Sequence, residues 1–205
     1  MPYPLVQNHR AWCWAVCAKL AGDIYKSSYP SFAFNLSALE KKYPFGMPIE
    51  SISGFRPDCL GIYQGQPTVD LWQWTITRAV SAVGAGTATD DEKKRALRFV
   101  ITGNPDSTQV EIVSAGKYGS GISLVSLFNE VLSDYLNDKG SVIGNYYTKE
   151  RNAFHSVIIN GNQDGLTLYD PWDGAIWPVT IRQLLTDGFS TNFGSGIIEW
   201  VQYIE

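Results

Sequence analysis

The chain has 205 residues, which suits one medium domain or two small lobes around a cleft and allows a sizeable core. With 44% hydrophobic and 18% charged residues, its composition is globular and excludes a disordered chain. The net charge of -4 gives no support for nucleic acid or an anionic membrane surface as a partner.

Helical patterns dominate the first part of the chain. Apolar residues recur at intervals of three and four over residues 12–25, which predicts a helix with one buried face. Residues 36–43 are a shorter helical candidate. Residues 44–67 are rich in Pro and Gly, so we expect a long irregular connection there. Residues 68–83 predict another helix, with Thr68 as its N-cap.

The middle of the chain mixes helix and strand patterns. A stretch of small residues at 84–89 is the best candidate for a boundary between two lobes. Residues 90–96 begin a charged helix, and the apolar run 97–101 is typical of a strand. Residues 109–113 alternate as a strand does, and 124–136 carry the apolar stripe of a helix.

The last third is dominated by strand patterns. Strands are predicted at 142–147, 154–161, 166–170 and 197–204, with a short helix at 181–185. Early helices followed by antiparallel hairpins predict a single domain of the α+β class. We expect a mainly helical lobe at 1–85 and a mainly β lobe at 86–205.

The three cysteines are Cys13, Cys17 and Cys59, a number too low to imply a disulfide framework. Cys13 lies where a loop enters the first predicted helix, near unpaired N–H groups and the positive end of the helix dipole. Both features lower the pKa of a thiol and favour the thiolate that a nucleophile requires. Cys17, one turn further on, is expected in the core, and Cys59 is expected to be a structural or exposed loop residue.

A cysteine nucleophile needs a base, and the chain has only two histidines. His9 lies in the loop before Cys13, where we expect it to line the cleft. His155 lies near the start of an apolar strand, which would hold a base in a fixed position. Asp170 ends the next strand of the same predicted hairpin, so antiparallel pairing should bring its carboxylate close to His155 and fix the imidazole tautomer.

Acyl transfer also needs donors for the oxyanion. The N–H of Cys13 at the helix N-terminus is one candidate, and the side-chain amide of Gln7, six residues upstream, is the second. No His, Cys and Asp residues have metal-ligand spacing, so we expect neither a metal nor another cofactor.

The combination of Gln7, Cys13-Trp14-Ala15, His155 and Asp170-Pro171-Trp172 resembles the papain-like cysteine peptidases. The second half is similar to the bacterial branches, the bacteriocin leader peptidases and effector proteases, which use Asp in place of Asn. The resemblance implies a papain-like fold with Cys13 as nucleophile, His155 as base, Asp170 as its orienter and Gln7 as oxyanion donor. It implies Trp172 as a shield over the His–Asp pair. The candidate substrate-contacting residues are Trp14, Trp172 and His9.

The implied function is that of a monomeric cysteine endopeptidase that forms a thioester with a peptide or protein substrate. The bacterial branches imply a small residue such as Gly before the cut. Two alternatives remain open: a transglutaminase-like or peptide-ligating acyl transferase with the same triad, and a non-catalytic binding module on a peptidase fold. The sequence shows no signal peptide or membrane-spanning run, so we expect a bacterial cytoplasmic protein or one exported as an effector without a signal peptide.

Overall fold

The computed structural model describes residues 6–28, 47–48, 54–59, 61–63, 66–80, 88–116, 123–130, 132–133, 136, 141–162 and 165–205. The helices are α1 (Cys13–Ser28), α3 (Leu71–Ala79), α4 (Asp90–Thr102) and α5 (Leu124–Glu130). The strands are β1 (Met47–Pro48), β2 (Gly61–Tyr63), β3 (Gln66–Val69), β4 (Ile112–Gly116), β5 (Ser141–Thr148), β6 (Ala153–Asn162), β7 (Gly165–Tyr169), β8 (Ile176–Val179), β9 (Phe189–Ser190), β10 (Ser195–Gly196) and β11 (Ile198–Ile204). Short turns of 3-10 and π helix lie at Pro57–Cys59 and Gln183–Asp187. This combination of helices and antiparallel strands confirms the α+β class.

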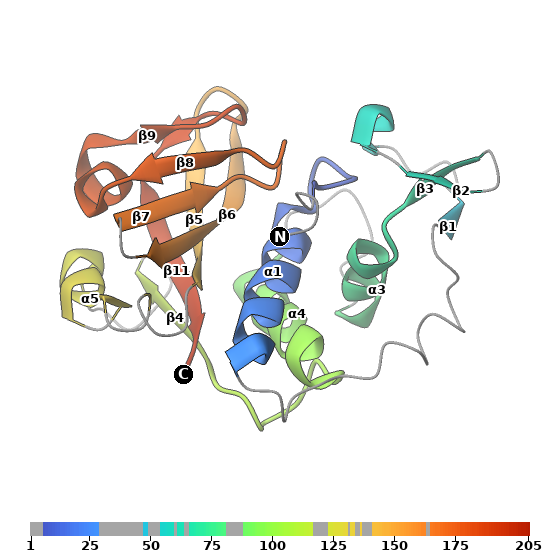
Figure 1. Ribbon diagram of the computed structural model, residues 1–205, viewed down its shortest axis with the longest axis horizontal. Coiled ribbons are helices and arrows are strands. Elements are labelled where there is room, and N and C mark those ends of the chain that lie inside the picture. Colours follow the sequence, from blue (N-terminus) through green and yellow to red (C-terminus); the bar gives the residue numbers. More distant parts are fainter. Residues whose placement is uncertain are drawn as a thin grey trace.

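The larger sheet has six antiparallel strands in the order β4-β11-β5-β6-β7-β8. Strands β5 to β8 follow one another as hairpins, and the last strand, β11, inserts between β4 and β5. One face of this sheet packs on α1 and α4, and α5 covers the other face (Figure 1). Alternation along β6 explains the two cores: Ile158 packs with the helices, whereas Val157 and Ile159 pack with the α5 side.

Helix α1 lies between the larger sheet and α3, and α4 packs beside α1 on the same face of the sheet (Figure 1). Its buried residues recur at helical spacing over more than half of its circumference, as expected of a helix covered on two sides. The contact with α4 is close at Gly22, where a Cβ atom would lie 2.5 Å from Cγ1 of Val100. A glycine at this position therefore sets how closely the two helices approach.

The strand predicted at 97–101 is wrong, because these residues continue α4 to Thr102. A capping box fixes the helix start: the Thr89 hydroxyl accepts from the Glu92 N–H, and the Glu92 carboxylate accepts from the Thr89 N–H. The apolar run is buried because one side of α4 packs on α1, and the helix ends at Gly103, whose φ of 77° is left-handed. A short apolar run does not distinguish a buried helix from a strand.

The region predicted to be irregular contains a small antiparallel sheet with the order β1-β3-β2. Thr68 belongs to β3, so it is not the N-cap of the following helix. Asp70 caps α3 instead, since its carboxylate accepts from the Gln73 N–H at 3.1 Å. Thr68 pairs with Gly61 in the small sheet, and Asp70, two positions later, takes the capping position.

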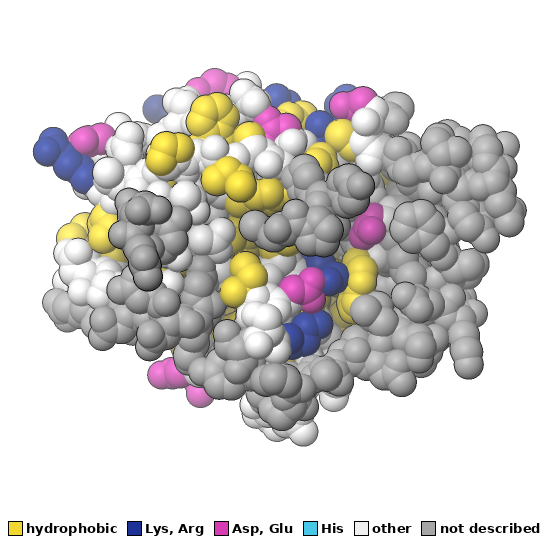
Figure 2. Space-filling model, in the orientation of Figure 1, with side chains coloured by type: hydrophobic (Ala, Val, Ile, Leu, Met, Phe, Trp, Pro, Cys, Tyr) yellow, Lys and Arg dark blue, Asp and Glu magenta, His cyan; other side chains and the backbone are white. Residues whose placement is uncertain are grey.

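Other differences concern element ends. Strand β4 begins at Ile112 rather than 109. The helix predicted at 124–136 is described as α5 over Leu124–Glu130, and residues 132, 133 and 136 are helical too. The short helix predicted at 181–185 includes a π turn at Gln183–Asp187. The helix predicted at 36–43 lies outside the described residues, as does most of the boundary at 84–89. Because α4 packs on α1 and α3, the helical side of the protein extends past the predicted division at residue 85. On the face shown in Figure 2, apolar and charged side chains are intermixed, and both histidines are buried.

Candidate active site

Cys13 is the first residue of α1, at the end of a tightly fixed loop. The loop is held to α3 and the small-sheet region: the Gln73 side chain accepts from Asn8 N at 2.7 Å, and Arg56 N donates to Asn8 O at 2.8 Å. Trp12 then closes the turn by donating to His9 O at 3.1 Å. These bonds fix the sulfur at the helix N-terminus, where the helix dipole favours a negative charge.

His155 and Asp170 meet as the hairpin geometry predicts. His155 lies on β6, Asp170 follows β7, and the imidazole Nε2 is 2.6 Å from Asp170 Oδ1. The same carboxylate oxygen accepts from Trp172 N at 2.8 Å. Because Gly174 N also donates to Asp170 O at 2.9 Å, a tight turn holds the carboxylate against the imidazole ring. Both side chains are fully buried, so the pair is shielded from water.

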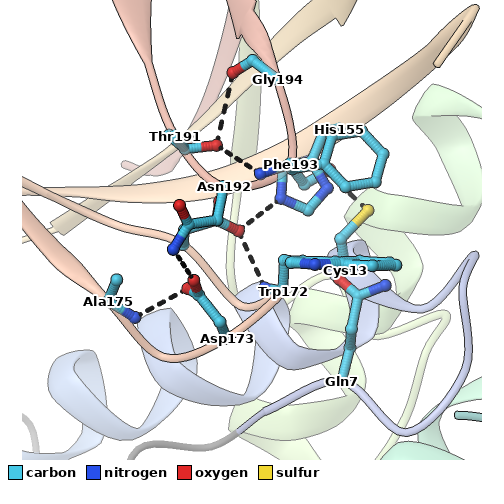
Figure 3. A network of polar contacts seen from close by, with 12 residues as sticks. Gln7, Cys13, His155, Trp172, Asp173, Ala175, Thr191, Asn192, Phe193 and Gly194 are labelled. Atoms are coloured by element: carbon cyan, nitrogen blue, oxygen red, sulfur yellow. Dashed lines mark hydrogen bonds and ion pairs between the residues drawn. The ribbon is translucent and has the colours of Figure 1, made fainter. Parts of the chain in front are cut away.

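The Cys13 sulfur lies at a buried edge of β6 that pairs with no strand. Strand β7 pairs with β6 only as far as Tyr169, opposite Ile158, so the beginning of β6 has no strand on that side. The N–H of Ser156 instead donates to Cys13 Sγ at 3.4 Å (Figure 3). Because β7 ends before it reaches this part of β6, the N-terminus of α1 can place the Cys13 sulfur next to Ser156, the residue after His155.

The electrostatic surroundings favour a charged pair. Burial raises the pKa of Cys13, but the positive charges of His155 and Lys93 and the N–H of Ser156 lower it to about 7. Burial lowers the pKa of His155, but the charge of Cys13 and the hydrogen bond to Asp170 raise it to about 9. Between these values a thiolate and an imidazolium coexist, which is the reactive form of a cysteine nucleophile.

The pKa of Cys17 is shifted in the opposite direction from that of Cys13, whereas the shift of Asp170 supports the charged pair. Burial and the negative charges of Cys13 and Asp170 raise the pKa of Cys17, so this thiol stays protonated. Burial opposes ionisation of Asp170, but the hydrogen bond and charge of His155 keep its pKa below the usual range. The structure therefore singles out Cys13 among the buried thiols and pairs it with an ionised Asp170 through His155.

Gln7 lies beside Cys13, but its amide group is already hydrogen-bonded (Figure 3). Its Nε2 donates to His9 O at 2.9 Å and to Arg10 O at 3.1 Å. Its backbone N donates to Pro171 O at 2.8 Å, which joins the loop of α1 to the turn after Asp170. In this arrangement Gln7 connects the two halves of the site, and no hydrogen of its amide is directed at a free oxyanion position.

His9 and Trp14, which were predicted to contact a substrate, are both buried at 1% exposure. The His9 ring stacks on Trp12 at 5.0 Å and meets Phe55 edge-on at 5.3 Å. Trp14 is enclosed in the core around α1. The rings of His9 and Trp14 have large apolar surfaces, and in this structure those surfaces pack in the core.

Phe193 occupies the position expected for Trp172. Its ring stacks on the His155 ring with 3.9 Å between centroids and an angle of 12° (Figure 3). Trp172 lies next to Phe193, with 5.2 Å between the ring centroids, and its own ring is contacted by the guanidinium groups of Arg56 at 3.8 Å and Arg151 at 4.5 Å. Of the three predicted substrate-contacting residues, only Trp172 is partly exposed near the site.

Phe193 was not predicted, and the sequence holds no spacing that would have identified it. It lies in a turn between β9 and β10, where Thr191 N donates to Gly194 O at 3.1 Å. Arg151 Nε donates to Phe193 O at 2.6 Å and holds this turn over the histidine. Only the tertiary arrangement of three segments brings the phenylalanine ring to the imidazole.

The chain matches no protein-family model and no curated protein sequence. Within the described part of the chain, no three His, Cys, Asp or Glu side chains are grouped so that they could hold a metal ion. The described helices include none with the length and apolar character needed to cross a membrane. The chemical interpretation of the site therefore depends on its own geometry.

Proposed function

We propose that this chain is a cysteine endopeptidase with a papain-like arrangement of its site. The observation that carries the proposal is the convergence of a helix N-terminal Cys13 with the buried pair of His155 and Asp170. A nucleophile, a base and an orienter of the base from three elements are the parts that covalent acyl transfer needs. The lowered pKa of Cys13 and the raised pKa of His155 support the same assignment.

In the first half of the reaction, the Cys13 thiolate attacks the carbonyl carbon of the scissile peptide bond. His155, as imidazolium, gives its proton to the leaving amine, and the C–N bond breaks to leave a thioester on Cys13. In the second half, neutral His155 takes a proton from water, which attacks the thioester and releases the carboxylic acid and the thiolate. Asp170 keeps the imidazole in the tautomer that directs its other nitrogen toward the sulfur.

The oxyanion is stabilised by the Cys13 N–H, which belongs to the first turn of α1, where backbone donors have no partner within the helix. Gln7 acts as the second donor only if substrate binding releases its bond to His9 O or Arg10 O. Replacing Gln7 with alanine should then lower kcat by about 10²-fold, the typical effect of removing an oxyanion donor.

The burial of the site supports a substrate with a small residue next to the cut. Cys13 is 3% exposed and His155 is 1% exposed, with Phe193 stacked on the imidazole. A narrow approach of this kind favours glycine over a branched side chain. Matched peptides with Gly or Leu before the cut should differ by about 10-fold or more in kcat/KM, in line with the penalty for forcing extra methylene groups into a tight site.

The decisive experiment combines turnover with thiol labelling. Cys13→Ala should abolish hydrolysis of a peptide library, whereas Cys17→Ala should retain it if folded. Iodoacetamide at about pH 7 should label Cys13 before Cys59, because burial and the neighbouring Asp58 raise the pKa of Cys59. Labelling confined to Cys59 would contradict the proposal, and product masses that show an added amine in place of water would identify an acyl transferase.

A further inference from the structure

A buried lysine lies behind the candidate nucleophile and has no role in the mechanism above. Lys93, in the first turns of α4, is 3% exposed, and its Nζ donates to Asn145 Oδ1 at 2.7 Å. The Nζ atom also lies 4.9 Å from the centroid of the Trp200 ring. Both partners are uncharged, and a buried ammonium is costly unless a negative charge is nearby.

Asn145 connects this lysine to the strand edge that meets Cys13. Its Oδ1 accepts a second hydrogen bond from Ser156 Oγ at 2.7 Å, and Ser156 N donates to Cys13 Sγ. Asn145 and Ser156 are directly opposite in the pairing of β5 with β6. Because the Ser156 N–H points away from β5, the two form a non-hydrogen-bonded pair, in which side chains approach most closely.

The charges around Lys93 come from two helices. Asp90 lies one turn earlier on α4, and Cys13 and Cys17 face the lysine from α1. The Asp90 carboxylate is already engaged with Ser114 Oγ at 2.8 Å, Gln202 Nε2 at 2.8 Å and Lys94 Nζ at 3.4 Å. Burial lowers the pKa of Lys93 below its usual value, and the negative charges of Cys13 and Asp90 oppose this shift.

We propose that Lys93 is a positioning residue that stabilises the Cys13 thiolate. Its ammonium supplies a second positive charge behind the sulfur, and its bond to Asn145 fixes Ser156 so that the amide points at Cys13. Among the interactions that lower the pKa of Cys13, the charge of Lys93 follows those of His155. The inference rests on the proposed function, because it assigns the thiolate to the nucleophile of that reaction.

The reaction forms the thiolate again during deacylation. His155 is neutral in the acyl-enzyme and becomes an imidazolium when it takes a proton from the attacking water. When the C–S bond then breaks and the electron pair returns to sulfur, Lys93 adds a second positive charge to that of His155. Loss of this charge should therefore lower kcat and leave KM nearly unchanged, since Lys93 has no access to the substrate.

The test measures the ionisation of Cys13 without requiring peptidase activity. The rate of iodoacetamide alkylation at Cys13, followed by peptide mass, is recorded against pH for the wild type, Lys93→Met and Lys94→Met. Lys94 is the next residue of α4 and pairs with Asp90 at the surface, so its variant is the matched control. Lys93→Met should raise the alkylation midpoint by about 1 pH unit, as expected for loss of a nearby opposite charge, and Lys94→Met should leave it unchanged.

A second variant guards against misfolding of Lys93→Met. Asn145→Asp keeps the shape of the side chain and places a carboxylate on Lys93, so it should also raise the midpoint, with circular dichroism to confirm the fold. A folded Lys93→Met protein with the wild-type midpoint and the wild-type kcat overturns the inference and leaves the peptidase proposal intact. A wild-type Cys13 with an ordinary thiol midpoint contradicts the proposed function itself.

Discussion

Replacing Cys13 with alanine should lower the pKa of His155 by more than one pH unit. Burial lowers this pKa, yet the thiolate of Cys13 and then the bond to Asp170 raise it from 6.5 to about 9. That difference corresponds to about 3 kcal/mol in favour of the charged ring. If the thiolate supplies half or more of this preference, the variant loses at least about one pH unit, while Asp170 retains the remainder.

The measurement is a titration of the imidazole nitrogens by NMR spectroscopy. The chain has only two histidines, so a His155→Gln variant identifies the signal by its loss. His9 lies in a separate aromatic cluster with Trp12 and Phe55, and it serves as the internal control. An unchanged His155 midpoint after removal of Cys13 would refute the charged-pair description of the site.

The same variant should change the pH dependence of stability. Because the pKa of His155 is raised on folding, its stabilisation is complete below pH 6.5 and is lost as pH rises through about 9. Cys13 acts in the opposite sense, since its stabilisation is lost as pH falls from 9.0 through about 7. The two effects oppose each other between pH 7 and 9 in the wild type. In Cys13→Ala the lowered pKa of His155 acts alone, so the unfolding free energy, measured in urea, should fall between pH 6.5 and about 8 and level off above it.

Substitutions at three further positions test separate parts of the structure. Asp170→Ala should lower kcat by about 10²–10⁴-fold. Asp170→Asn should lower kcat less, because the Oδ1 of asparagine can still accept a hydrogen bond from His155 Nε2. Equal losses of kcat for the two variants in peptide assays would contradict this role of Asp170. Phe193→Ala should cost about 3 kcal/mol of stability and lower kcat, because the ring stacked on His155 is lost; a wild-type urea midpoint and kcat would argue against the stacking role. Gly22→Ala should lower the unfolding free energy, measured in urea, by about 1–3 kcal/mol, because its Cβ would lie 2.5 Å from Val100 Cγ1. This loss should outweigh the better helix propensity of alanine. A gain in stability would disprove the close contact between the two helices.

Much of the candidate site could be predicted because its residues lie on elements with strong local signals. The apolar periodicity after Cys13 marks α1, and alternation with a turn marks the β6–β7 hairpin. Antiparallel pairing then requires His155 and Asp170 to approach each other. Local patterns failed where one pattern fits two structures, as for residues 97–101, which pack as the end of α4.

The sequence by itself determined which residue types form the candidate site and which elements hold them, since Cys13, His155 and Asp170 lie at element ends that local patterns mark. The tertiary structure alone decided what surrounds them. It placed Phe193 on the imidazole and Lys93 behind the sulfur through contacts between segments distant in the chain. The physical reason is that periodicity and capping act within a few residues, whereas stacking, burial and charge depend on which elements pack together.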